Sequence, residues 1–198
     1  MPSQLAICNM ALAHIGKAPI TSINDATESA RKCLLFYDNT KKAVLRRIDW
    51  PFARTAEALG LIDLETIPGW SYLYTYPSDA VLVRKILIEN ASSTDKSYDW
   101  IGCLSPVTAT KSIACNVSDA YAEYTANILD PTQFDPLFVD AFAAKLAATI
   151  AQPLTGSQEV VKYALGIYQF HINEAAVVGR NEEKNPKDIE TKYISARG

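Results

Sequence analysis

The sequence predicts an α+β protein in which helical segments at both ends of the chain flank a β-rich segment. Apolar residues recur every three or four positions before residue 51 and after residue 134. Between these points, short aromatic and β-branched runs are separated by turn-forming residues. We therefore expect three parts: an antiparallel helical bundle from residues 1–51 and 130–180, an inserted small antiparallel β domain at 52–129, and an extended C-terminal arm at 181–198.

The N-terminal segment predicts two helices. Ser3 can cap the first helix and Gly16 can end it, and its apolar residues are Leu5, Cys8, Leu12 and Ile15. A turn-rich connection follows, and a second helix is expected from near Thr27 to Pro51. Its apolar stripe consists of Ala30, Cys33, Leu34, Tyr37, Val44, Leu45 and Ile48. Two helices with one apolar face each need a further partner to bury those faces.

The central segment predicts five or six short antiparallel strands. The clearest runs are 71–76, 81–88 and 120–125, which are rich in tyrosine, valine and isoleucine. Proline, glycine and polar runs separate them, as expected for turns.

The C-terminal half returns to a helical period. Five large apolar residues are spaced four apart, with alanines on the other faces, namely Phe134, Phe138, Phe142, Leu146 and Ile150. We expect this helix to be central, because small residues allow neighbours to approach closely. Pro153 and Gly156 are expected to break the chain, and Ser157 to cap a last long helix. The apolar seam of that helix includes His171.

Composition and charge exclude several classes of protein. The chain has 198 residues, of which 48% are hydrophobic and 21% charged, so it is an ordinary globular protein rather than a disordered one. Its formal net charge of −3 argues against a general nucleic-acid binder. The apolar stretch 5–15 contains Asn9 and His14 and follows no basic residue, so we expect no signal peptide and no membrane span. We expect synthesis in a cytoplasm.

No residue pattern calls for catalysis, a metal or a cofactor. The four cysteines are widely spread without a C-x-x-C pair, so we interpret them as free, buried thiols. His14 is expected to complement a helix C-terminus and His171 to be a satisfied core histidine. The sequence contains no glycine-rich phosphate loop, no G-x-S-x-G and no H-E-x-x-H. We therefore expect a protein that is not an enzyme.

Two groups of residues are candidates for contacts with other molecules. The basic group Lys41, Lys42, Arg46 and Arg47 lies on the second helix, where Asp38 can pair with Lys42. It is consistent with a solvated helix face, a contact with an acidic neighbouring subunit, or nucleic acid. The second group is Tyr72, Tyr74 and Tyr76, which share one strand face and suit either sheet packing or an interface.

An ensemble of short patterns along nearly the whole chain carries a resemblance. They are Ala11-x-x-x-Ile15-Gly16-x-x-Pro19-Ile20, Tyr37-Asp38, Leu45-Arg46, Trp50-Pro51-Phe52-Ala53-Arg54, Gly69-Trp70-x-Tyr72, Tyr76-Pro77-x-Asp79 and Phe134-Asp135-Pro136-x-Phe138. Together they resemble the tail tubular protein A family of tailed bacteriophages, also called head-to-tail adaptor or tail accessory proteins. These residues are packing and turn residues, not a catalytic signature.

The resemblance implies a structural protein of the virion neck or tail. Such a protein forms a ring, usually of twelve copies, beneath the portal protein and offers a platform to the tail nozzle or later tail proteins. Genome DNA would pass through the ring without specific binding. The acidic balance of the chain suits such a conduit, since like charge keeps phosphate from adhering to the wall.

The C-terminal arm is the predicted interface with the portal or a neighbouring subunit. It is charged and contains few large apolar residues, so alone it cannot bury enough surface to order itself. The interface residues expected there are Lys187, Ile189, Lys192, Tyr193, Ile194 and Arg197.

Two alternative functions remain open: a virion-associated peptidoglycan hydrolase, and a regulatory or nucleic-acid-binding module.

Overall fold

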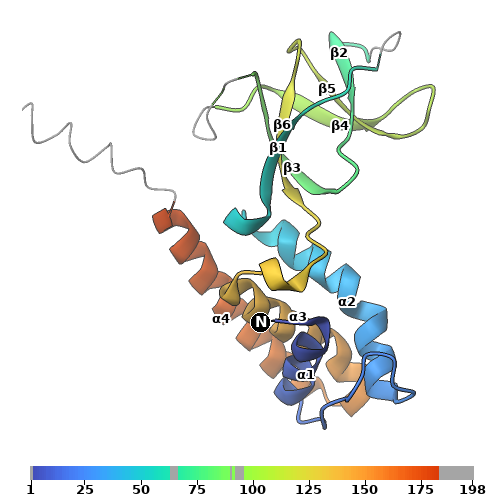
Figure 1. The fold of residues 1–198 in the computed structure, drawn as a ribbon, viewed down its shortest axis with the longest axis vertical. Helices are drawn as coiled ribbons and strands as arrows, with labels where there is room; N and C mark the ends of the chain where they lie inside the picture. The colour runs from blue at the N-terminus through green and yellow to red at the C-terminus, as the bar shows by residue number, and fades with distance from the viewer. Residues whose placement is uncertain (1, 63–66, 90, 92–95, 183–198) are drawn as a thin grey trace, which may run out of the picture. The chain divides into compact units, whose positions relative to one another are not determined.

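The computed structural model describes residues 2–62, 67–89, 91 and 96–182, and it is mixed α+β (Figure 1). The chain forms two compact units, of which one combines Met1–Val44 with Asp130–Gly198 and the other is Leu45–Leu129. The described residues contain four α-helices and two three-stranded antiparallel sheets. The α+β class is therefore confirmed. The predicted arm lies almost entirely outside the described residues.

The first helix, α1 (Gln4–His14), begins and ends where the sequence predicts. The Ser3 hydroxyl accepts a hydrogen bond from the Ala6 amide at 3.1 Å and so satisfies a donor that the helix itself leaves unpaired. Gly16 has a φ of +69°, the left-handed conformation that glycine adopts without strain. The connection to the next helix is held by Asn9, whose side chain bonds both the amide and the carbonyl of Ile20.

The second helix, α2 (Glu28–Arg47), is shorter than predicted at its C-terminal end. The Thr27 hydroxyl accepts a hydrogen bond from the Ala30 amide at 3.2 Å, which confirms the expected start. The helix was expected to reach Pro51 but ends at Arg47. Because a residue before proline is driven toward extended backbone, Trp50 adopts φ −87° and ψ 116°, and residues Pro51–Ala53 form a separate 3-10 turn.

Helix α3 (Pro136–Thr155) carries the core of the helical unit and packs against α1 and α4 (Gln158–Glu182). The spaced phenylalanines stack along it: the rings of Phe138 and Phe142 are 5.7 Å apart, and Tyr37 meets Phe142 edge to face at 4.9 Å. By length and hydropathy α3 could cross a membrane, but 61% of its most apolar window is buried inside the structure, which is typical of a core helix.

Pro153 does not break α3, contrary to the prediction from the sequence. A proline inside a helix lacks the amide donor that would bond the carbonyl four residues earlier, here that of Thr149. Pro153 lies in the last turn, so this loss affects one bond near the helix end, and the helix continues to Thr155. The chain turns at Gly156, whose φ of +67° ends the helix as expected.

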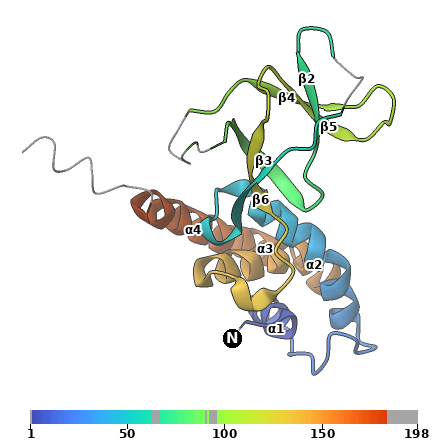
Figure 2. The ribbon, with the colours of Figure 1, turned by 45° about the horizontal axis from the view of Figure 1, so that its top comes forward.

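The described residues of the β-rich unit form two sheets of three strands each, consistent with the five or six short antiparallel strands predicted (Figure 2). In the first sheet, the order is β1 (Arg54–Ala58), β6 (Tyr121–Ala126), β3 (Ala80–Leu87). In the second, it is β2 (Tyr72–Thr75), β5 (Lys111–Cys115), β4 (Trp100–Leu104).

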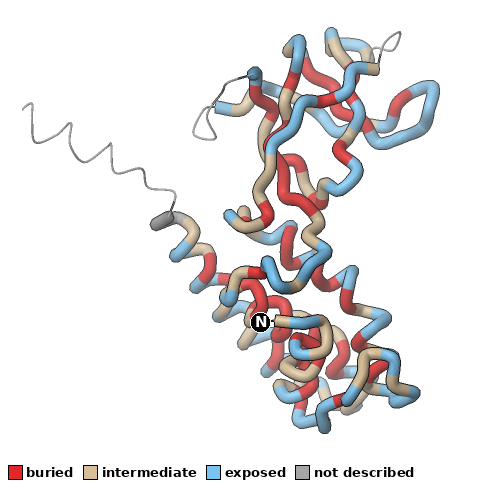
Figure 3. Tube along the Cα trace, in the orientation of Figure 1, coloured by how far each residue is buried: buried red, intermediate tan, exposed pale blue. Residues whose placement is uncertain are grey.

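Both sheets contribute to one core in this unit. Buried residues from β2, β3, β5 and β6 form a single cluster, which includes Tyr74, Val83, Ile86, Ile113 and Tyr124. Buried positions recur along both the helices and the strands, so each unit has its own apolar interior (Figure 3).

Candidate interaction surfaces

The four residues of the basic group on α2, Lys41, Lys42, Arg46 and Arg47, have different surroundings. The carboxylate of Asp38 pairs with the ammonium groups of Lys41 at 3.2 Å and Lys42 at 2.7 Å, one turn along the helix. The hydrogen bond from Lys42 is the main reason that the pKa of Asp38 lies below its ordinary value. Arg46 donates to the carbonyl oxygen of Val81 at 2.6 Å, while Arg47 is exposed. These residues therefore do not form one free cationic patch.

Lys41 differs from its neighbours because it is buried. Only 4% of the residue is exposed, and Thr40 beside it is buried as well. The long aliphatic stem of a lysine can cover apolar surface while its ammonium group keeps a polar partner, here Asp38. Lys41 thus belongs to the packing of the helix more than to its solvated face.

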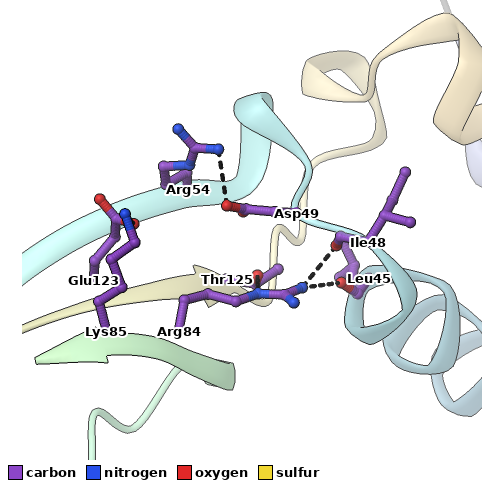
Figure 4. A network of polar contacts seen from close by, with 8 residues as sticks. All are labelled: Leu45, Ile48, Asp49, Arg54, Arg84, Lys85, Glu123 and Thr125. Atoms are coloured by element: carbon purple, nitrogen blue, oxygen red, sulfur yellow. Dashed lines mark hydrogen bonds and ion pairs between the residues drawn. The ribbon is translucent and has the colours of Figure 1, made fainter. Parts of the chain in front are cut away.

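The last turn of α2 belongs to the β-rich unit, and a side chain of the same unit caps it (Figure 4). The guanidinium group of Arg84, on β3, donates to the carbonyl oxygens of Leu45 at 3.2 Å and Ile48 at 2.7 Å. Its Nε also donates to the Thr125 hydroxyl at 3.0 Å. A cation at a helix C-terminus satisfies carbonyls that have no helical partner and complements the helix dipole. Burial lowers the pKa of Arg84.

Two further ion pairs lie beside this cap (Figure 4). Arg54, at the start of β1, donates to the carboxylate of Asp49 at 2.8 Å. Lys85, adjacent to Arg84 on β3, lies 3.7 Å from the buried carboxylate of Glu123 on β6. The Arg54–Asp49 pair links the segment after α2 to the start of β1, and the Lys85–Glu123 pair joins β3 to β6.

The tyrosine group mainly serves the interior of the β-rich unit. Tyr74 is 2% exposed and donates its hydroxyl proton to the Val117 carbonyl at 2.8 Å, and its ring lies 6.2 Å from that of Tyr72. Tyr76 lies just beyond the end of β2 and is half-buried. Its hydroxyl accepts from the Val83 amide, and Lys111 lies over its ring at 3.4 Å. Sheet packing is thus their role within this chain.

An exposed apolar stripe runs along α4 and was not singled out from the sequence. Tyr163, Phe170 and Val177 are 63%, 64% and 53% exposed. They are spaced seven residues apart, so they lie on the same side of the helix. The buried residues Ala164 and Ala175 lie on another side of the helix. Large apolar side chains grouped on a surface indicate contact with another protein or a membrane.

The hairpin of β4 and β5 presents a second set of exposed apolar residues. Leu104 and Val107 lie at and just after the end of β4, and both are exposed. Ile101 on the same strand is also exposed. Such residues at a hairpin are available for contacts that the isolated chain does not make.

The two histidines interact within the helical unit. Burial lowers the pKa of His14, the charge of His171 lowers it further, and Asp140 opposes this effect. His171 Nδ1 is buried without a hydrogen-bond partner among the described residues and lies 3.7 Å from a carboxylate oxygen of Glu174. The prediction that His171 is a satisfied core histidine is therefore wrong for this nitrogen. The apolar period of α4 could not reveal it.

The described residues contain no group of three or more histidine, cysteine or acidic side chains placed to hold a metal ion. The predicted interface residues Lys187, Ile189, Lys192, Tyr193, Ile194 and Arg197 lie outside the described residues. No protein-family model matches this sequence, and no curated protein matches it either. The relationship to the tail tubular protein A family therefore stays a prediction.

Proposed function

We propose that this chain is a structural protein of a tailed bacteriophage: a head-to-tail adaptor that joins the portal protein to the tail. In this proposal it is not an enzyme and uses no cofactor. It is made in the host cytoplasm and works in the virion neck or tail, as a ring of about twelve copies. DNA passes through the ring without specific binding.

The observation that carries the proposal is the exposed apolar stripe on α4. Tyr163, Phe170 and Val177 offer the kind of aromatic and aliphatic surface that is enriched at protein–protein interfaces. Contacts between identical copies in a ring are heterologous, so one face of each copy must meet a different face of the next. The exposed residues of the β4–β5 hairpin supply a separate apolar face.

The residues that carry the resemblance have structural roles, which suits a scaffold. Asp79 accepts a hydrogen bond from the Tyr124 hydroxyl at 2.9 Å. Trp50 and Phe52 pack with ring centroids 6.1 Å apart at the exit from α2. Asp135 caps α3 by accepting from the Leu137 amide at 2.8 Å. Each of these contacts shapes a turn or junction.

The proposal includes the antiparallel bundle predicted from the two ends of the chain. Packing of α3 on α1 and on α4 supports it, as does the contact of Tyr37 on α2 with Phe142 on α3. Lys145 over the ring of Tyr168, at 5.1 Å, is a further contact between α3 and α4.

The test is sedimentation velocity of the full chain, alone and mixed with the portal protein encoded by the same genome. We expect a monomer alone and a ring-sized complex with the portal, because the three exposed side chains on α4 are too few to hold a ring together without further contacts from the portal. Phe170→Ser should abolish the complex, whereas Tyr98→Ser, an exposed aromatic on the β-rich unit, should not. A full chain that never joins portal rings would contradict the proposal.

The predicted arm is tested by the same assay. Removal of residues 186–198 should leave a folded monomer that no longer joins the portal. Circular dichroism of the truncated chain checks folding independently. If the truncated chain joined portal rings as well as the full chain, the arm would not be the portal interface.

A further inference from the structure

The end strands of the two sheets differ in how their outer edges are covered. A bridge between Leu61 and Tyr74 covers the outer edge of β2. On β3, the Ile86 amide donates to the Ser97 hydroxyl at 3.0 Å, and the Ile86 carbonyl accepts from the Tyr98 amide at 2.9 Å. These contacts occupy backbone groups that a second strand would otherwise bind.

The outer edge of β4 has no such cover. The strand lies at the end of its sheet, after β2 and β5 (Figure 1). The Ser105 amide donates to the Thr110 carbonyl at 2.8 Å, and in an antiparallel pair the bonded positions recur at every second residue. The backbone groups that point away from β5 therefore belong to the alternate residues Trp100, Gly102 and Leu104. Among the residues that the structure describes, none pairs with these groups.

The edge formed by β4 is also uncharged and apolar. Its five residues carry no charge, whereas the end strand β1 contains Arg54 and Glu57. Ile101 and Leu104 on β4 and Val107 just after it are exposed. Charged residues on an end strand oppose pairing with another strand, so an uncharged, apolar edge favours it.

We propose that β4 pairs antiparallel with β4 of a second copy of this chain, about a two-fold axis at Gly102. Gly102 then lies opposite Gly102 of the second copy, and Trp100 opposite Leu104, so every outward N–H and C=O group of the strand finds a partner. A second copy supplies a strand of the same length, without charge, whose open groups lie in the same register. Both copies use the same edge, so the association stops at a dimer. This inference does not rest on the proposed function.

The side chains of β4 suit this pairing. Trp100 is half-buried against the core of the β-rich unit, and its ring lies on the same face of the strand as Gly102. Leu104 shares that face, because side chains alternate along a strand. In the dimer, the exposed Leu104 of each copy lies across from Trp100 of the other, and such aromatic–aliphatic pairs stabilise sheets. No like charges meet, since the strand has none.

The dimer is expected to be weak. One strand of five residues buries much less surface than the roughly 1,600 Å² of a standard interface. We therefore expect a dissociation constant on the order of 0.1 mM. At about 20 µM most chains are then monomers, in agreement with the monomer expected for the free chain in sedimentation. At about 1 mM roughly four fifths of the chains are paired.

The experiment is amide hydrogen exchange of the full chain, followed residue by residue by NMR at about 20 µM and 1 mM. Exchange at Trp100, Gly102 and Leu104 should slow about fourfold at the higher concentration, because pairing protects their amides. Ile101 and Cys103 serve as controls, since their amides already face β5 and should not respond to concentration. Unchanged exchange at the three outward amides, or protection confined to another surface, would overturn the inference.

Charge variants at Gly102 test the two-fold register. A Cβ atom at this position would lie 3.9 Å from the Trp100 ring, an ordinary contact, so the fold accepts a side chain there. In Gly102→Lys and in Gly102→Glu, like charges face each other across the axis, so each variant alone should stay a monomer at about 1 mM. An equal mixture of the two should recover the dimer, and the uncharged Gly102→Ala should keep it.

NMR diffusion measures the size of each variant, and circular dichroism checks its folding. Dimerisation of Gly102→Lys alone to the wild-type extent would overturn the proposed register, as would a mixture of folded Lys and Glu variants that stays monomeric. If a variant does not fold, the exchange pattern of the wild-type chain still decides the question.

Discussion

The cap that Arg84 forms on α2 predicts a measurable loss of stability in the β-rich unit. Arg84→Met keeps a long, unbranched side chain but removes the guanidinium donors to Leu45, Ile48 and Thr125. The two carbonyls at the helix end would then depend on water. The ion pairs of Arg54 and Lys85 beside the cap are left in place.

The size of the loss follows from the number of hydrogen bonds and their exposure. A hydrogen bond to a charged group contributes about 1.5–3 kcal/mol when buried. The Arg84 side chain is only half-buried, so water replaces part of each bond. We therefore expect Arg84→Met to lower the free energy of unfolding by about 2–3 kcal/mol in all. Arg84→Lys, which supplies a charge without the planar fork, should recover part of the loss.

The assay uses the positions of the three tryptophans. Trp50, Trp70 and Trp100 are all in Leu45–Leu129, so tryptophan fluorescence during urea unfolding reports on the β-rich unit. The matched control is Arg47→Met, which removes an exposed arginine from the same helix end. We expect that control to change stability by less than about 0.5 kcal/mol. Equal free energies of unfolding for the Arg84→Met and Arg47→Met variants would refute the capping role.

Two predictions concern the helical unit, which contains no tryptophan and is followed by far-ultraviolet circular dichroism. Phe142→Ala should lower its free energy of unfolding by about 3–5 kcal/mol, because the buried ring packs between Tyr37 and Phe138, and a loss below about 1 kcal/mol would contradict this packing. Because the folded pKa of His14 is lowered, the unfolded chain binds more protons just below pH 6.5, so stability should fall as the pH decreases through that range. His14→Gln should weaken this pH dependence, and an unchanged pH profile would count against a lowered pKa of His14 in the folded chain.

Much of the fold could be predicted because its elements are encoded locally. The hydroxyl of Ser3 and the left-handed Gly16 bound α1, and the four-residue spacing from Phe134 predicts the buried face of α3. The sheet order could not be predicted. β6 lies between β1 and β3, and β5 between β2 and β4, and such pairings depend on the packing of the whole unit and not on any short pattern.

The surfaces were harder to predict than the fold, and two residues show why. A signal for Lys41 was present, since it lies four residues after Tyr37 and three before Val44, both in the apolar stripe, and its 4% exposure follows from that spacing. Its charge instead placed it in the basic group, for which the sequence left open a solvated face, a contact with an acidic subunit and a contact with nucleic acid. No comparable signal exists for Arg84. As a charged residue between Val83 and Lys85, it resembles a solvent-facing strand position, and its partners are backbone carbonyls 36 and 39 residues earlier in the chain. Contacts with backbone leave no trace in residue type at the accepting positions, so only the folded structure reveals them.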